Sequence, residues 1–247
     1  MTVATEAETG TGTEGAPRTV GIIGGMGPAA TIALQRLILE AVPASDDADH
    51  VPLLVDMNPQ VPSRIARLLE GGTEDPEPVL VRMARRLERA GAEALAMPCN
   101  TAHHYARSIE AAVAVPLLDM ISLAVEALCG RSAPGDRVGL LGSPAVARLG
   151  LFDEPLRGRG RVPLWPEDPA APLAIIRRIK GSGPDEAAAR ALGDESRGLA
   201  ERGARVQLLC CTEFSLLPAD ALAGDVVAID ALRVLAEAVV AFATRAR

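Results

Sequence analysis

Residues 89–101 read RAGAEALAMPCNT, and residues 201–213 read ERGARVQLLCCTE. In both stretches a glycine stands eight positions before a cysteine, Gly91 before Cys99 and Gly203 before Cys211. An apolar run typical of a buried strand separates the glycine from the cysteine each time. The pattern predicts that one structural unit occurs twice, with a cysteine where the same internal strand ends.

Two further landmarks repeat on either side of these stretches. The run TVGIIGG at 19–25 is matched by RVGLLGS at 137–143, and VPLLD at 115–119 is matched by VVAID at 226–230. The landmarks occur in the same order and at nearly the same spacing in both halves. We therefore expect two similar halves.

Short apolar runs alternate with amphipathic segments along the first half. Their spacing predicts strands at 19–25, 50–57, 92–98 and 115–120, and helices at 28–42, 76–91 and 101–113. Near-continuous apolar strands between helices indicate parallel sheets that helices cover on both faces. The expected fold class is α/β, with two Rossmann-like (flavodoxin-like) halves related by a pseudo-twofold axis around one cleft.

The expected organisation is a tail followed by two domains. Thr, Glu, Gly and Ala dominate residues 1–17, a composition that predicts disorder. The N-terminal domain is expected to span 18–118 together with a returning helix at 231–247, and the C-terminal domain 119–230.

Composition disfavours several classes of function. A net charge of −7 and an aromatic content of 2% argue against a nucleic-acid partner. No apolar run is long enough for a bilayer, and the N-terminus lacks the basic and apolar parts of a signal peptide, so no membrane partner is expected. The four cysteines show no framework spacing, which predicts free thiols in the cytoplasm.

The repeat also predicts a geometry for the two cysteines. In open α/β sheets, ligands collect at the carboxyl ends of the strands, where helix N-termini also point. Cys99 and Cys211 should then face each other across the cleft. Asn100, Thr101 and Thr212 are typical N-cap residues, and a helix N-terminus is expected to lower the pKa of each thiol.

Two facing thiols can form an acid/base pair. A thiolate removes a proton from one face of a bound carbon, and a thiol delivers a proton to the other face. The net result is racemisation or epimerisation at a carbon acid. Backbone N–H groups with the side chains of Asn100, Thr101 and Thr212 would stabilise the carbanion. No lysine has a recognisable pyridoxal-phosphate context and no metal-ligand spacing is evident, so no cofactor and no metal are expected.

Five motifs resemble those of the cofactor-independent aspartate/glutamate racemases. They are GIIGGMGPAAT at 21–31, NPQVPSR at 58–64, MPCNTAH at 97–103, IKGS at 179–182 and CTEF at 211–214. The resemblance runs from about residue 19 to the C-terminus. It implies a two-domain α/β protein, usually a homodimer, with its active site between the domains and a small amino acid or carboxylate as substrate.

The resemblance also implies roles for single residues. Cys99 and Cys211 would be the two catalytic bases, and three neighbours, Asn100, Thr101 and Thr212, would hold the α-carboxylate. Met26 and Gly27 would line the pocket, and Arg64 and Lys180 would meet a side-chain carboxylate. The other candidates are Asn58 and Glu213 for substrate binding, with His103 and Ser143 in supporting roles.

Three positions near the expected pocket depart from the pattern of similar proteins. Cys210 stands where many relatives have glycine, and Ser63 stands where aspartate is common before the arginine. The loop SPAV, Ser143 to Val146, replaces a Thr-x-Gly-Thr sequence. The resemblance therefore supports the type of reaction better than it supports aspartate as the substrate.

Other functions remain open at this point. A related cysteine-dependent isomerase or decarboxylase could act on a hydantoin, maleate or a malonate. The run GMGPAA at 25–30 fits a dinucleotide-binding turn, with Asp56 as a ribose ligand, and would suit an NAD-dependent oxidoreductase. A non-catalytic amino-acid-binding protein is a third alternative. A metal site formed by Cys99, His103 and His104 is disfavoured, because adjacent helical side chains point about 100° apart.

Overall fold

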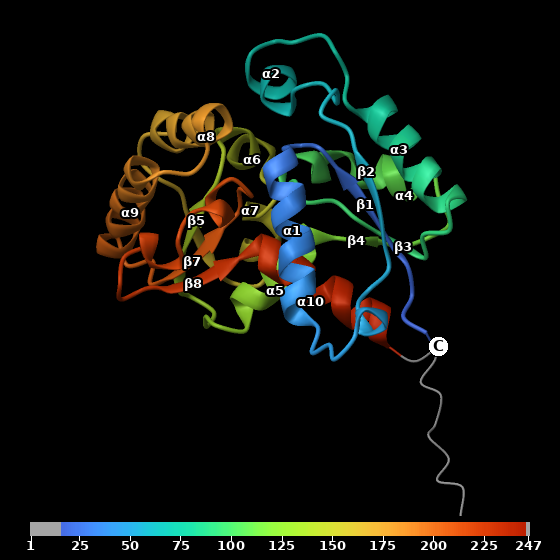
Figure 1. The fold of residues 1–247 in the computed structure, drawn as a ribbon. Helices are drawn as coiled ribbons and strands as arrows, with labels where there is room; N and C mark the ends of the chain where they lie inside the picture. The colour runs from blue at the N-terminus through green and yellow to red at the C-terminus, as the bar shows by residue number, and fades with distance from the viewer. Residues whose placement is uncertain (1–15, 246–247) are drawn as a thin grey trace, which may run out of the picture.

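The computed structural model describes residues 16–245 (Figure 1). The tail expected at 1–17 therefore lies outside the described residues, except for its last two positions. The first sheet has the order β2(Leu53–Met57)–β1(Val20–Gly24)–β3(Ala94–Ala96)–β4(Leu117–Leu118), and its strands are parallel. The second has the order β6(Val162–Leu164)–β5(Arg137–Leu141)–β7(Val206–Leu209)–β8(Val227–Asp230), also parallel. The predicted α/β class with two similar halves is confirmed.

Helices fill the space between the sheets and cover their outer faces (Figure 1). The central layer holds α1(Pro28–Ala41), α5(Met120–Cys129) and α10(Ala231–Thr244). The outer face of the first sheet carries α3(Glu77–Arg89) and α4(Ala106–Glu110), and that of the second carries α8(Ala170–Ser182) and α9(Glu186–Glu201). The short helices are α2(Arg64–Leu69), α6(Pro144–Leu149), α7(Asp153–Gly158) and the 3-10 turns η1(Asp47–Asp49), η2(Thr101–Tyr105), η3(Phe214–Leu216) and η4(Ala219–Ala221).

The central core is shared by the two sheets. Val20 and Ile22 of β1 point into it from one side, and Val138 and Leu140 of β5 from the other. The next residue, Ile23, faces the outer helices instead, as the two-residue period of a strand requires. Both faces of each sheet are thus buried, which explains the near-continuous apolar runs of the sequence.

The repeated glycines and aspartates have the same structural role in both halves. Gly91 and Gly203 end α3 and α9 with positive φ angles of 100° and 91°. The residue after each glycine donates its N–H to a carbonyl five positions back, at 3.0 Å in both halves, which closes the helix end. Asp119 and Asp230 are the N-caps of α5 and α10, and each Oδ1 accepts a backbone N–H two residues on.

Several predicted elements are shorter in the structure. The strands expected at 50–57, 92–98 and 115–120 shrink to β2, β3 and β4. Pro52, Pro98 and Pro116 cannot donate to a ladder, which shortens the pairing. The helix expected at 101–113 begins as the 3-10 turn η2, with i to i−3 bonds, and continues as α4 only to Glu110.

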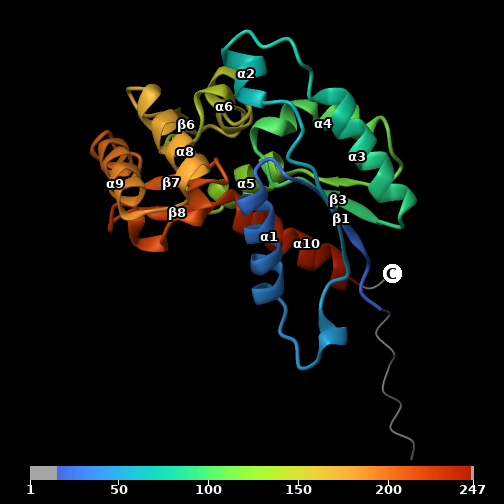
Figure 2. The ribbon, with the colours of Figure 1, turned by 45° about the horizontal axis from the view of Figure 1, so that its top comes forward.

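The segment that contains α2 lies next to α6, at the top of Figure 2. It contacts α6 of the second half, and Arg177 of α8 pairs with Glu70 at 2.6 Å. Helix α10 packs on both α1 and α5. Among residues 16–245, no helix combines the length and apolar character of a membrane span.

Candidate active site

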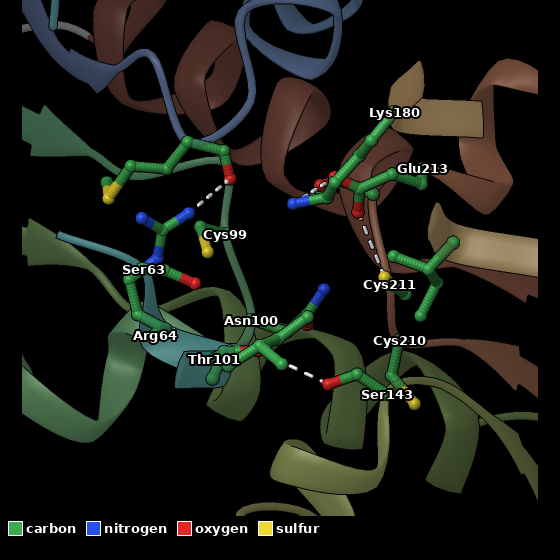
Figure 3. Close-up of a pocket in the computed structure, with 14 residues that line it drawn as sticks. Ser63, Arg64, Cys99, Asn100, Thr101, Ser143, Lys180, Cys210, Cys211 and Glu213 are labelled. Carbon is green, nitrogen blue, oxygen red and sulfur yellow. Dashed lines mark hydrogen bonds and ion pairs between the residues drawn. The ribbon is translucent and has the colours of Figure 1, made fainter. Parts of the chain in front are cut away.

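A small cavity lies at the carboxyl ends of β3 and β7, between the two halves (Figure 3). Cys99 follows β3 and Cys211 follows β7, and the two side chains lie on opposite sides of this cavity. The lining residues are Met26, Ser63, Arg64, Ile65, Cys99, Asn100, Thr101, Ser143, Ile176, Lys180, Cys210, Cys211, Thr212 and Glu213. The repeat of the sequence thus brings its two cysteines to one place.

The cavity is narrow and adjoins a wider cleft. Its volume is about 40 Å³, enough for a few water molecules but too little for an amino acid. The neighbouring cleft has a volume of about 550 Å³ and includes the turn around Gly27 and the start of α1. Five residues line both spaces: Met26, Ser63, Arg64, Lys180 and Glu213. A small molecule bound between the cysteines can therefore extend past Arg64 and Lys180 into the wider cleft.

Cys211 belongs to a short chain of polar contacts. Its Sγ lies 3.0 Å from Glu213 Oε2, and Glu213 Oε1 lies 3.0 Å from Lys180 Nζ (Figure 3). The carboxylate is only 6% exposed. Among the described residues, the Cys99 thiol has no such carboxylate partner. The two thiols therefore differ in their surroundings.

Burial and charge set the pKa values of Cys211 and Lys180. Burial raises the pKa of the Cys211 thiol well above its ordinary value, and the negative charge of Glu213 raises it further, while Lys180 opposes both. Burial lowers the pKa of the Lys180 ammonium. The negative charges of Glu213, Cys99 and Cys211 outweigh that effect, so the Lys180 pKa is raised. Lys180 stays charged beside both sulfurs.

The expectation that helix N-termini lower the pKa of both thiols is wrong for Cys211. The element after Cys211 is η3, a three-residue 3-10 turn, and η2 after Cys99 has five residues. Neither is a long helix whose dipole could offset burial. The expected capping role of Asn100 is also wrong, because its side chain makes no cap hydrogen bond.

Asn100 instead presents an unpaired amide to the cavity. It is 2% exposed, and neither its Nδ2 nor its Oδ1 has a hydrogen-bond partner among residues 16–245. A buried amide without partners costs free energy unless a ligand satisfies it. The Asn100 side chain is therefore placed to bind a polar group that enters between the cysteines.

Hydroxyl groups from the two halves meet on the same side of the cavity. Thr101 Oγ1 lies 3.5 Å from Ser143 Oγ (Figure 3), and Ser143 also caps α6 by accepting the Val146 N–H. Thr212 lines the cavity from the second half and is 4% exposed. Together with Asn100 these groups can surround a carboxylate.

His103 connects the backbone at Cys99 to the start of α5. Its Nε2 accepts the Met120 N–H at 3.1 Å, which requires Nδ1 to carry the proton and donate to the Cys99 carbonyl at 2.9 Å. Burial lowers the pKa of the His103 imidazole, although its bond to the Cys99 carbonyl and the charge of Asp119 act in the opposite direction. His103 is thus a neutral link between Cys99 and the start of α5.

The buried imidazole leads to an expected pH dependence of folding. The unfolded chain gains a proton at His103 below the ordinary pKa of 6.5, whereas the folded state holds it neutral. Its contribution to stability is therefore fully present above pH 6.5 and is lost as the pH falls below it, by at most about 1.4 kcal/mol per pH unit. Urea unfolding at pH 5 and 7.5 should show a smaller loss for His103→Gln than for the wild type.

The exposed neighbour provides the control for this experiment. His104→Gln should keep the wild-type pH dependence, because the His104 side chain is exposed and does not link two elements. Equal slopes for the wild type and His103→Gln between pH 5 and 6.5 would contradict the assignment.

Arg64 supplies a cation at the border between cavity and cleft. Its Nη1 donates to the carbonyls of Val61 and Pro62, and its Nη2 donates to the carbonyl of Met26 at 3.2 Å (Figure 3). Its buried Nε has no partner among residues 16–245. No carboxylate of the described chain neutralises this guanidinium, and the neighbouring Ser63 caps α2.

Two predicted substrate-binding residues lie outside the inner cavity. Asn58 does not line it: Oδ1 accepts the Gln60 N–H in a local turn, and Nδ2 points to the Met83 sulfur. Gly27 lines only the wider cleft. Gly25, two residues before Gly27, has a φ angle of +92°. Its backbone also passes so close to that of Asn58 that there is no room for a Cβ.

The structure adds cavity residues that carry no predicted role. Ile176 precedes Lys180 by one turn of α8, so helical spacing alone could have identified it. Ile65 directly follows Arg64 in α2. Cys210 is fully buried beside Gly142, where a Cβ would come within 2.6 Å of its sulfur, and burial raises the pKa of its thiol.

The residues needed for two alternative functions have other partners. Asp56, the candidate ribose ligand of an NAD site, accepts Arg86 Nη2 at 2.6 Å and Nε at 3.0 Å. Both ring nitrogens of His103 are occupied by backbone groups, and His104 is exposed. The described structure therefore favours neither the dinucleotide nor the Cys–His–His metal interpretation.

Comparison with known proteins agrees with this architecture. The sequence profile of a family described as Asp/Glu/Hydantoin racemase matches residues 23–239. The broad specificity amino-acid racemase RacX of Bacillus subtilis (strain 168) is 25% identical over 146 residues, 58% of this chain and 62% of the relative. That match spans less than two thirds of the relative's length.

Solved structures share the fold. The aspartate racemase of Picrophilus torridus has a TM-score of 0.83 and 27% identity, covering 93% of this chain and 96% of that one. A glutamate racemase of Francisella tularensis subsp. tularensis SCHU S4, solved with D-glutamate, has a TM-score of 0.63 and 15% identity, covering 91% and 80%. The second likeness concerns the fold alone.

Proposed function

The chain belongs to the Asp/Glu/Hydantoin racemase family, and from this premise we propose that it inverts the α-carbon of an amino acid such as aspartate or glutamate without a cofactor. The observation that carries the proposal is the position of Cys99 and Cys211 on opposite sides of one buried cavity. Each cysteine follows the same strand of its half, so the pair can act on opposite faces of one carbon.

The proposed reaction needs only proton transfers. The thiolate of one cysteine removes the α-proton, and the electron pair of the Cα–H bond moves into the carboxylate. The thiol of the other cysteine then delivers its proton to the opposite face of Cα. One proton is taken up and one is released, so the pair of thiols carries the same total charge before and after the reaction.

We propose that Asn100, Thr101 and Thr212 bind the α-carboxylate. The unpaired amide of Asn100 supports this role most directly, because its Nδ2 can donate to the carboxylate and so become satisfied. The negative charge of the carbanion grows on this same carboxylate during proton removal. Donors fixed around it therefore stabilise the transition state more than the bound substrate.

Two cations favour an acidic side chain on the substrate. Arg64 and Lys180 stand where the inner cavity meets the wider cleft, and the guanidinium has no carboxylate partner among the described residues. A carboxylate at the end of the substrate would balance the charge of Arg64, while Lys180 is already paired with Glu213. The wider cleft gives room for tails longer than that of aspartate.

Hydrogen exchange in heavy water tests the proposed function. Single enantiomers of aspartate, glutamate, glutamine and alanine are incubated with folded protein, and deuterium at Cα is followed by mass spectrometry and chiral chromatography. We expect deuterium uptake together with inversion, faster for the two acidic substrates than for their neutral analogues. The absence of exchange from every substrate would refute the racemase proposal.

The same assay separates the alternatives. A hydantoin or maleate isomerase, or a malonate decarboxylase, would convert its substrate without exchanging amino-acid α-protons. A non-catalytic binding protein would shift its melting temperature with an amino acid but exchange nothing. We also propose a homodimer in the cytoplasm and domains at 18–118 plus 231–247 and at 119–230, as the sequence suggests.

A further inference from the structure

Glu213 is in contact with only one of the two thiols. Its Oε2 lies 3.0 Å from Cys211 Sγ, whereas Cys99 has no carboxylate partner among the described residues. A two-base mechanism needs one thiol and one thiolate at a time but does not by itself say which is which. The asymmetry of contacts can decide this question.

Two positive groups lie beside the Glu213 carboxylate. Lys180 Nζ lies 3.0 Å from its Oε1. The N-terminus of the 14-residue helix α1 also lies close by, since a Cβ built on Gly27 would be 3.9 Å from the same oxygen. The first turn of α1 contains no acidic residue that would compete for its partial positive charge. With its other oxygen paired to the Lys180 ammonium, the Glu213 carboxylate accepts in its contact with Cys211.

If the carboxylate accepts, the sulfur must donate. The short Sγ–Oε2 contact thus requires a proton on Cys211, because a thiolate at 3.0 Å from a carboxylate would place two negative charges side by side. Cys99 lacks this repulsion and shares the field of Lys180 from across the cavity. The titratable and charged groups that face Cys211 across the cavity are Glu213, Lys180, Cys99 and, at the border of the cavity, Arg64.

We propose that Glu213 is a positioning residue that holds the resting proton on Cys211 and so leaves Cys99 as the base. This assignment rests on the proposed racemase function and makes the two directions of the reaction unequal. With the first enantiomer, Cys99 forms an S–H bond with the α-proton and Cys211 loses its proton to the opposite face of Cα. The protein is left with a Cys211 thiolate beside the Glu213 carboxylate.

The form with a thiolate at Cys211 is less stable than the form with a thiolate at Cys99, and this difference affects the kinetics. The enantiomer whose α-proton faces Cys99 binds the major resting form, while its mirror image needs the minor form, and a small population of the competent form raises its KM. The equilibrium constant of racemisation is unity, so kcat/KM must be equal for both enantiomers. The mirror-image substrate must therefore show a higher KM and, by the same factor, a higher kcat.

The test compares the wild type with Glu213→Gln. Gln keeps the shape of the side chain but removes the charge that opposes a Cys211 thiolate. Each protein is treated with iodoacetamide between pH 6 and 10, and the rates at Cys99 and Cys211 are read separately by peptide mass spectrometry. We expect Cys99 to react first in the wild type, and the Cys211 rate relative to Cys99 to rise about tenfold near pH 8 in Glu213→Gln.

Steady-state kinetics provide the second measurement. The KM values of the two enantiomers should differ about tenfold in the wild type and approach each other in Glu213→Gln. A merely structural role would change both enantiomers equally. Glu186→Gln, the same substitution in an exposed surface ion pair, is the matched control and should leave both measurements unchanged.

Either of two results would overturn the proposal. One is equal alkylation of Cys99 and Cys211 in the wild type at pH 7.5, which needs no variant and does not depend on the folding of Glu213→Gln. The other is an unchanged Cys211 rate in a folded Glu213→Gln protein. Because alkylation requires no turnover, it decides the role of Glu213 even if no amino acid proves to be racemised.

Discussion

Replacing Cys99 or Cys211 by serine is expected to lower the rate of inversion by about 10³-fold or more. A serine hydroxyl holds its proton far more tightly than a thiol, so the variant keeps one competent base of the two. Both thiols line the same cavity, and the proposed two-base inversion needs both. Chiral chromatography of the product measures the loss. Cys129→Ser is the control, because Cys129 is half-buried at the end of α5, away from the cavity.

The single variants should differ in their exchange with solvent. A protein that retains only Cys211 can remove the α-proton of the enantiomer that faces Cys211 and return a deuteron from heavy water to the same face. We therefore expect exchange without inversion for one enantiomer in Cys99→Ser and for the opposite enantiomer in Cys211→Ser. Exchange of both enantiomers by one variant, or inversion at the wild-type rate, would exclude the two-base assignment.

Asn100→Leu is expected to lower kcat/KM about 10²-fold and to raise the free energy of unfolding by about 1 kcal/mol. The leucine keeps the approximate shape of asparagine but removes two buried polar atoms that have no partner among residues 16–245. Folding then no longer leaves an amide unsatisfied, while substrate binding loses a donor. Urea unfolding and steady-state kinetics on one preparation measure both effects.

Asn58→Leu should produce the opposite pattern. The Asn58 side chain accepts the Gln60 N–H and does not line the inner cavity, so the substitution should lower stability and leave kcat/KM close to the wild-type value. A stability loss in Asn100→Leu with unchanged kinetics would show that Asn100 has a structural role only.

The parts of the fold that depend on local chemistry could be predicted from the sequence. Gly91 and Gly203 end helices because glycine readily adopts the positive φ angle of a helix end. Asp119 and Asp230 begin helices because their carboxylates accept the free backbone N–H groups of the first turn. Their repetition was therefore sufficient to predict two similar halves. The meeting of Cys99 and Cys211 followed from that symmetry.

The asymmetric parts of the site could not be predicted in this way. The contact between Lys180 and Glu213 depends on how α8 crosses the end of β7, which no local pattern encodes. The burial that raises the pKa of Cys211 depends on the whole cavity and overrides the expected effect of a helix start. The Asn58 side chain accepts a hydrogen bond within its own turn, and a sequence motif cannot distinguish such a bond from ligand binding.

The position of α10 has a consequence for synthesis of the protein. This helix is the last ordered element of the described chain, yet it lies between the two sheets and packs on α1 and α5. A nascent chain that still holds residues 231–244 in the ribosomal tunnel cannot close the core around either sheet. The cleft between the halves therefore forms only after residues 231–244 have left the tunnel.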